Sequence, residues 1–229
     1  MKKLSLLGLA AAAPLLIGVL IGRTNIDNRA EAQTVEETGD TRRADEGLKL
    51  RAQIQNDPVA PTIAPKGADV TLVMFSDYQC PFCRKVHPVL EQLRSEDKRV
   101  KIVYRDWPIF GAGSVEAARA AIAAQYQGKH AAFNDAMMKA QGKVTSQSVR
   151  AAADKAGVDW ARLQADLKTH AADIDGAIDR TGRYAAMMGL SGTPGMLVGP
   201  YLIPGAIDLA GLRKAVALAR ENPTGASAS

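Results

Sequence analysis

Both cysteines of this 229-residue chain lie in one short segment, Cys80-Pro81-Phe82-Cys83. The segment follows an apolar run at residues 70–75, which is typical of a buried strand, and a proline at position 81 suits the first turn of a helix. At a helix start, the Cys80 sulfur would lie beside unpaired backbone N–H groups and the positive end of the helix dipole, which stabilise a thiolate. A thiolate with a second thiol in reach is what thiol–disulfide exchange requires.

Residues 1–22 are typical of a signal peptide or an N-terminal membrane anchor. Lys2 and Lys3 precede an uncharged stretch at residues 4–21, whereas a secretory apolar region has about 7–15 residues and a membrane span about 17–25. Cleavage after Ala32 would release the protein, and retention of residues 4–21 would tether it to the inner membrane; the length of the stretch favours the tether. Either way, we expect the rest of the chain to be exported to the periplasm.

The charge and the cysteine content narrow the range of functions. The chain has 29 basic and 24 acidic residues, a net charge of +5, and such a small, dispersed excess gives no reason to expect a nucleic-acid partner. An exported protein whose only two cysteines form one Cys-x-x-Cys uses them for redox chemistry rather than as a structural disulfide.

The chain divides by composition into four parts. After the first 22 residues, we expect a polar linker at residues 23–66 with one short helix around residues 43–55. A coiled-coil stalk is the alternative for this segment, but no heptad repeat is sustained, so we expect a monomer. Residues 67–221 form the globular domain, and residues 222–229 are predicted to be a disordered tail.

The globular domain is predicted to begin with a β-α-β unit. The apolar run at residues 70–75 is the first strand, a helix follows Cys80, and residues 99–105 alternate as a second strand does. The cysteines therefore lie at the turn from strand to helix. Two further strands are predicted at residues 196–198 and 201–203, and a final helix at residues 209–221.

A long helical segment separates these two groups of elements, from Gly111 to Gly189. Ser114 and Asp159 are predicted to be helix N-caps, and Gly189 to end the last helix of the segment. No internal repeat is present, which argues against a solenoid.

Three segments together resemble the DsbA-like thiol:disulfide oxidoreductases of the thioredoxin superfamily. They are residues 75–83 (Phe-Ser-Asp-Tyr-Gln-Cys-Pro-Phe-Cys), residues 104–108 (Tyr-Arg-Asp-Trp-Pro) and residues 192–195 (Gly-Thr-Pro-Gly). The resemblance implies an α/β protein with a thioredoxin fold and an inserted all-helical domain at about residues 111–189.

The resemblance also implies roles for individual residues. Cys80 would be the exposed nucleophile, Cys83 the resolving thiol, and Pro194 a cis-proline that faces them. A cis bond would leave the backbone of the preceding residue free to pair with a substrate segment. The residues expected to contact substrate are Thr193, Pro81 and Phe82.

The chain departs from the family at one position. A buried acidic residue often lies six positions before the nucleophile, where it is proposed to shuttle a proton to the resolving thiol. Here that position is Met74, so the shuttle is absent or supplied by another group. Asp77 is a candidate, although an acid in a strand-to-helix turn more often forms local hydrogen bonds.

We expect neither a metal nor a cofactor. His87 follows Cys83 by four residues and shares its helix face, but a structural zinc site needs four ligands. Met187 and Met188 precede the proline loop and could line a substrate groove, although such methionines more often belong to the core.

The predicted function is disulfide formation in exported proteins of the bacterial cell envelope, through Cys80 and Cys83. The partners would be unfolded or thiol-containing exported proteins and a membrane redox partner that recycles the cysteine pair. Two alternatives remain: an isomerase or reductase kept reduced by a membrane partner, and a redox-inactive, chaperone-like binding module.

Overall fold

The computed structural model describes residues 42–43 and 45–225. The predicted signal or anchor at residues 1–22 and the last part of the predicted tail, residues 226–229, lie outside the described residues. The chain divides into two compact units, one ending at Lys49 and the other running from Leu50 onward. In the first unit, residues 45–49 are helical; the second holds the sheet. No helix in the described part of the chain is long and apolar enough to cross a membrane.

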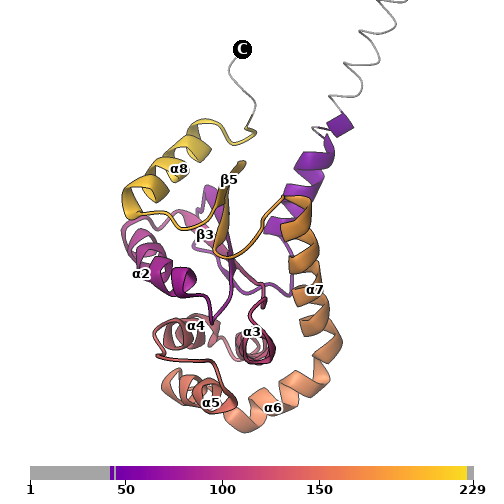
Figure 1. Cartoon of the computed structure of the whole chain (residues 1–229). Coiled ribbons are helices and arrows are strands. Elements are labelled where there is room, and N and C mark those ends of the chain that lie inside the picture. The colour runs from indigo at the N-terminus through magenta and orange to yellow at the C-terminus, as the bar shows by residue number, and fades with distance from the viewer. Residues whose placement is uncertain (1–41, 44, 226–229) are drawn as a thin grey trace, which may run out of the picture. The chain divides into compact units, whose positions relative to one another are not determined.

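Five strands form one mixed sheet in the order β1-β3-β2-β4-β5 (Figure 1). Strands β2 and β3 are parallel, with Ser76 paired to Asp106, and the other neighbouring pairs are antiparallel. The carboxyl ends of β2 and β3 therefore lie side by side just before the cysteine segment. The strands are β1 (Thr62–Ile63), β2 (Val70–Ser76), β3 (Val100–Asp106), β4 (Gly195–Val198) and β5 (Tyr201–Pro204).

Helices cover both faces of this sheet. Helices α2 (Pro81–Glu96) and α8 (Leu209–Glu221) lie on one side and α7 (Ala171–Met187) on the other (Figure 1). Successive side chains of a strand point to opposite faces. Leu72 accordingly packs in the core under α2 and α8, whereas Val73 packs in the core under α7. Burial on both faces explains why β2 is an uninterrupted apolar run.

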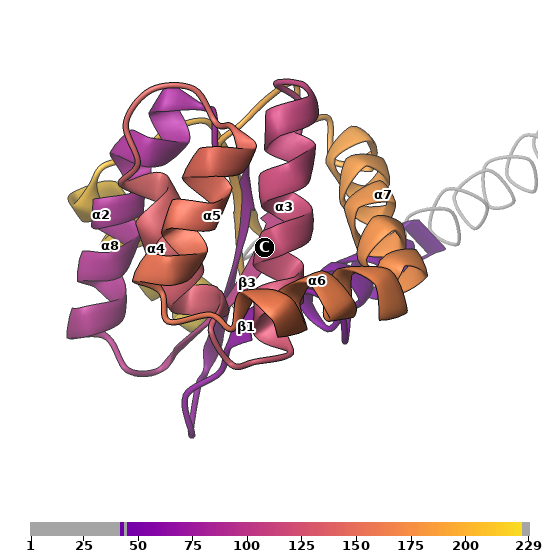
Figure 2. The ribbon, with the colours of Figure 1, turned by 90° about the horizontal axis from the view of Figure 1, so that it is seen from below.

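The predicted helical insert consists of α3 to α7 and has a core of its own. Figure 2 shows α3, α4 and α5 grouped together, with α6 leading to α7. Phe133, Met137, Leu163 and Ile174 are all fully buried in this core. The bounds are α3 (Ala112–Gln125), α4 (His130–Met138), α5 (Ser146–Lys155) and α6 (Trp160–Thr169).

The predicted helix ends are mostly confirmed. The Asp159 carboxylate accepts the Arg162 N–H at the start of α6, as an N-cap does. Gly189 follows α7 with a φ of +71°, a conformation that glycine adopts at little cost. The Ser114 prediction is wrong, because α3 already begins at Ala112 and the Ser114 side chain is fully buried.

The linker prediction is wrong for residues 50–66. The predicted short helix is present and extends to residue 55. Its residues 50–55 belong to the second unit, and Ile54 is buried in the core of that unit at 1% exposure. Strand β1 then adds an edge to the sheet by pairing with β3. The polar composition of residues 50–66 suggests a linker, but several polar groups of this segment form hydrogen bonds and ion pairs within the folded domain.

The main example is a buried ion cluster of Asp57, Arg105 and Arg180. The Asp57 carboxylate accepts hydrogen bonds from Arg105 Nη1 at 2.8 Å and from Arg180 Nε at 2.8 Å. Arg105 is 1% exposed and also donates to the Ile54 carbonyl. The cluster thus connects the segment before β1 to β3 and to α7.

Candidate active site

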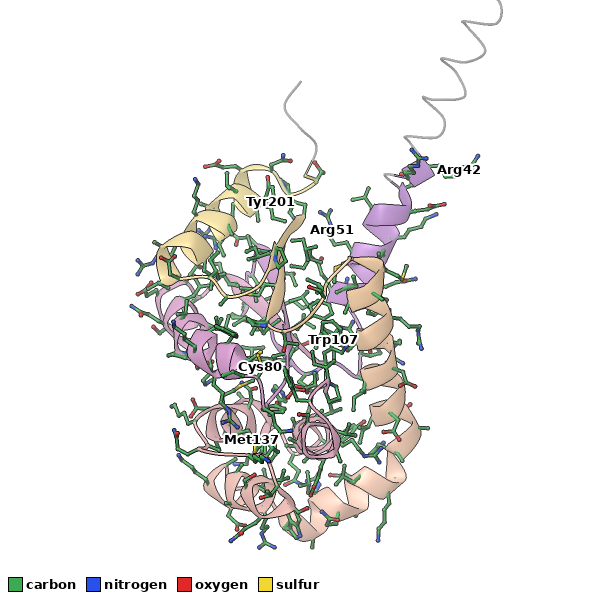
Figure 3. All side chains as sticks on the ribbon, viewed as in Figure 1. Arg42, Arg51, Cys80, Trp107, Met137 and Tyr201 are labelled. Carbon is green, nitrogen blue, oxygen red and sulfur yellow. The ribbon has the colours of Figure 1, made fainter. Side chains whose placement is uncertain are left out.

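Cys80 is the N-cap of α2, and its sulfur accepts a hydrogen bond from the Cys83 N–H at 3.3 Å. Figure 3 shows Cys80 at the junction of the sheet and the insert, where Met137 lies on the insert side. The Cys80 thiol donates to the Thr193 carbonyl oxygen at 3.2 Å. Cys80 is only 1% exposed, contrary to expectation, because the loop that contains Thr193 lies over its sulfur.

Cys83 lies one turn further into α2 and is completely buried. Burial raises the pKa of its thiol far above the usual value, although a hydrogen bond with the Asp77 backbone acts in the opposite direction. Both cysteines are free thiols in this structure. The two sulfurs therefore differ. The Cys80 sulfur lies beside N–H groups at the start of α2, whereas the Cys83 sulfur lies inside the core, where a thiolate is unfavourable.

The peptide bond between Thr193 and Pro194 is cis, as predicted. The loop leads into β4, and the Pro194 carbonyl accepts the Gly205 N–H at 2.9 Å, which fixes the loop against the β4–β5 hairpin. Cys80 and Thr193 are 113 residues apart in the sequence, and their hydrogen bond joins the two predicted halves of the site.

Exposed apolar side chains lie next to the cysteines. Pro81 is exposed, and Phe82 is 59% exposed at the start of α2. Ile109 and Phe110 are also exposed, and their backbone N–H groups bind the Asp77 carboxylate. These hydrogen bonds hold Ile109 and Phe110 beside the cysteine loop, and no local sequence pattern distinguishes either residue.

Asp77 organises this loop. Its carboxylate accepts four hydrogen bonds: from the backbone N–H groups of Gln79, Ile109 and Phe110, and from the hydroxyl of Ser114 at 2.7 Å. Both oxygens are thus engaged in holding the loop, which agrees with the local hydrogen-bonding interpretation rather than with a proton shuttle. Ser114 is not predictable as a partner of Asp77 from local sequence, since the two residues are 37 positions apart.

A second set of contacts attaches the insert to α2. Arg84 donates to the Tyr78 carbonyl at 2.9 Å and to the Gly142 carbonyl at 3.0 Å. A groove of about 390 Å³ lies beside these residues, between the start of α2 and the end of α4. Its lining consists of Pro81, Arg84, His87, Pro88, Met138, Lys139, Ala140 and Gln141.

The histidines have protein partners. His87 Nε2 lies 2.9 Å from an Asp135 carboxylate oxygen, and His170 stacks on Tyr126. His130 packs against Tyr104, and burial lowers the pKa of its imidazole to about 3. Within the described part of the chain, no three potential metal ligands are grouped closely enough to hold an ion.

A thioredoxin-type sheet, two cysteines at a helix start and a cis-proline loop against them define the class of thioredoxin-like thiol:disulfide oxidoreductases. The chain belongs to the DSBA-like thioredoxin domain family, which matches residues 71–217. It is similar to a thioredoxin-like oxidoreductase from Silicibacter pomeroyi, at 40% identity and a TM-score of 0.71, covering 75% of this chain and 98% of that one.

Two further solved structures support this assignment. The thiol-disulfide exchange protein alpha-DsbA2 from Wolbachia pipientis is 27% identical, with a TM-score of 0.72 over 79% of this chain and 97% of that one. A periplasmic thioredoxin-like protein from Salmonella enterica is 30% identical, with a TM-score of 0.68 over 76% and 97%.

The chain also resembles part of a much longer protein. It is 29% identical over 158 residues to a Na(+)/H(+) antiporter, NhaA 1, from Salinispora arenicola. The match covers 66% of this chain but only 23% of the antiporter. The chain thus spans about a quarter of the length of the curated relatives that it matches.

Proposed function

We propose that this protein catalyses disulfide formation in exported proteins of the bacterial cell envelope, with Cys80 as the nucleophile and Cys83 as the resolving thiol. The observation that carries the proposal is the contrast between the two sulfurs. The Cys80 sulfur accepts the Cys83 N–H at the start of α2 and faces the Thr193 carbonyl, whereas Cys83 lies one turn further along α2, where burial raises the pKa of its thiol.

The exchange begins from a Cys80–Cys83 disulfide. A substrate thiolate attacks Cys80 Sγ, forming a mixed disulfide, and Cys83 leaves as a thiolate that takes up a proton. A second substrate thiolate then attacks the substrate sulfur of the mixed disulfide, which releases Cys80 as a thiolate. The N–H groups at the helix start stabilise that leaving group and so favour oxidation of the substrate.

The surface around the cysteines suits an unfolded polypeptide. The exposed side chains of Phe82 and Phe110 offer apolar contacts, and Thr193 offers backbone groups for pairing with an extended segment. Export to the periplasm is supported by the uncharged stretch at residues 4–21 and by the periplasmic relative from Salmonella. A membrane redox partner would reoxidise the pair, and the protein would act as a monomer.

Trapping of mixed disulfides tests the two cysteine roles. Cys83→Ser should accumulate mixed disulfides with envelope proteins, because Cys80 can still react but nothing resolves the product. Cys80→Ser should accumulate none, because the remaining Cys83 thiol lies one turn inside α2 and its raised pKa disfavours the reactive thiolate. Non-reducing gels compare the two variants with Cys80→Ser/Cys83→Ser as the background control, and equal trapping by both single variants would overturn the assignment.

The direction of the reaction needs a second measurement. An oxidase should have a reduction potential above about −200 mV and should oxidise a reduced model protein faster than it repairs a scrambled one. Equilibration with glutathione and native mass spectrometry give the potential and the oligomeric state. A stable oligomer with a lower potential that unscrambles disulfides efficiently would make the protein an isomerase instead.

A further inference from the structure

A groove of about 390 Å³ lies beside the reactive cysteine, where α4 lies next to the start of α2 (Figure 1). Pro81, the residue after Cys80, belongs to its lining, and so do residues 139–141, which follow α4. Among the described residues that line the groove, none belongs to the proline loop or to the β4–β5 hairpin. The groove is therefore separate from the Thr193 backbone, the other place proposed to contact substrate.

Basic side chains are concentrated around this groove. Residues 81–90 of α2 and residues 136–145, which connect α4 to α5, contain no acidic residue. The Asp135 carboxylate, just before the second segment, lies 2.9 Å from His87 Nε2 and 2.7 Å from Lys139 Nζ. The two segments contain four cationic side chains beside this one carboxylate, so the potential around the groove is positive. The four are Arg84, Lys85, Lys139 and Lys143.

The two cations that line the groove remain able to attract an anion. Arg84 donates to the Tyr78 and Gly142 carbonyls at 2.9 and 3.0 Å, and no carboxylate among the described residues pairs with it. Those hydrogen bonds fix the Arg84 guanidinium group in place without neutralising its charge. Lys139 is 61% exposed, and an exposed ion pair such as that with Asp135 contributes little free energy, so the Lys139 ammonium group can exchange partners.

The groove has the length of a short piece of extended chain. Its lining includes the residue adjacent to Cys80, so a chain bonded to Cys80 Sγ can enter the groove directly. Along α2 the lining extends from Pro81 to Pro88, about 10 Å at 1.5 Å per residue, which equals about three extended residues. Pro81, Pro88 and Met138 offer apolar contacts between the charges. A concave site of this kind admits an extended polypeptide, whereas the surface of a bilayer is flat.

We propose that this groove binds substrate polypeptides that carry acidic side chains within about three residues of the cysteine that reacts with Cys80. The inference rests on the proposed function and narrows its substrate class. The substrate carboxylates pair with Lys139 and are attracted by the fixed charge of Arg84, while the rest of the segment packs on the proline rings. The charges speed the encounter and hold the substrate sulfur beside Cys80 without taking part in the exchange itself.

Three reduced peptides that differ only in charge test the inference. Each has two cysteines, so that it can fully reduce the Cys80–Cys83 disulfide, and carries glutamates, glutamines or lysines at the same positions around the first cysteine. Rapid quenching, alkylation of thiols and mass spectrometry give the rate constant with the oxidised protein. Dividing it by the rate constant of the same peptide with 2-hydroxyethyl disulfide, which is uncharged, removes the effect of the charges on the peptide thiol. The normalised rate should be at least about threefold higher for the glutamate peptide than for the glutamine peptide, and lowest for the lysine peptide. Salt at about 0.5 M should reduce these differences.

Charge variants of the protein separate binding in the groove from a structural effect. Lys139→Glu and Lys143→Glu should each lower the ratio of the glutamate to the glutamine rate by at least about threefold, whereas Asp135→Asn, which removes a carboxylate, should raise it. Lys168→Glu is the matched control, because Lys168 is exposed on α6 and does not line the groove, and it should leave the ratio unchanged. The glutamine peptide should react within about twofold of the wild-type rate in all four variants, since damage to the active site would slow all the peptides together.

Equal normalised rates for the glutamate and glutamine peptides in the wild type would overturn the inference, while oxidation of the glutamine peptide would leave the proposed function intact. A ratio that neither Lys139→Glu nor Lys143→Glu changes would overturn it as well; if Lys139→Glu does not fold, Lys143→Glu decides alone. Binding to phosphatidylglycerol vesicles that Lys143→Glu abolishes, without any preference among the peptides, would assign these charges to a membrane surface instead. A wild-type protein that oxidises none of the three peptides would overturn the proposed function, and the role of the groove with it.

Discussion

Replacing Asp57 with asparagine should destabilise the folded protein by about 3–5 kcal/mol at neutral pH, because Arg105 would remain buried without a counter-charge. Part of this loss follows from the pKa of Asp57. Burial would raise that pKa, but hydrogen bonds from Arg180 and Arg105 lower it from the ordinary 3.8 to about 2. At about 1.4 kcal/mol per pKa unit, the charged carboxylate contributes about 2.5 kcal/mol at neutral pH.

This contribution has a defined pH dependence. Because the pKa is lower in the folded state, the contribution is present above the unfolded value of 3.8 and is lost as the pH falls towards about 2. The difference in stability between the wild type and Asp57→Asn should therefore shrink by about 2 kcal/mol over that range. Urea unfolding of both reduced proteins, monitored by circular dichroism at neutral pH and at about pH 2, measures this difference in unfolding free energy.

A surface ion pair provides the control. Asp154→Asn removes the ion pair with Arg150. Because the side chains of Asp154 and Arg150 are 55% and 50% exposed, the loss of unfolding free energy should be less than about 0.5 kcal/mol. A loss of less than about 1 kcal/mol in Asp57→Asn at neutral pH would show that Arg105 does not depend on this counter-charge. A difference between the wild type and the variant that stays constant on acidification would show that the charge of Asp57 does not contribute to stability.

Three further substitutions probe the elements that hold the site. Ser114→Ala should cost about 1–2 kcal/mol in urea unfolding, because a buried Asp77 oxygen loses its hydroxyl donor; no loss would show that the bond contributes nothing. Gly113→Ala should destabilise by about 1–3 kcal/mol, because the added methyl group would overlap the backbone carbonyl of Val144, and a neutral result would mean that the loop yields easily. Asp159→Ala should cost about 1 kcal/mol through loss of the α6 cap, whereas Asp159→Asn, which keeps an acceptor, should restore most of it.

The sequence was sufficient for those features that depend on neighbouring residues. The strand at residues 70–76, the helix that starts at Pro81 and the Asp159 cap follow from local patterns. The thioredoxin fold and the cis bond before Pro194 were predicted from motifs that occur together and in order.

Features that depend on distant pairs were missed. The Asp57 carboxylate contacts Arg180 across 123 positions, and nothing in the local sequence of either residue indicates the other. The local sequence around Ser114 is typical of an N-cap, but the Ser114 hydroxyl instead donates a hydrogen bond to the buried Asp77 carboxylate. The exposure of Cys80 was also mispredicted, because the covering loop comes from the far end of the chain.

The hydrogen bond between Cys80 and Thr193 has a consequence for how the chain is made. The two residues are separated by 113 positions and by the whole helical insert. A ribosome supplies the cysteines first, so while the 113 residues from Cys80 to Thr193 are made, the nascent chain carries the thiols without the loop that covers them. Since β4 must also pair with β2 to place that loop, the pair of thiols becomes an enclosed site only after β4 has emerged.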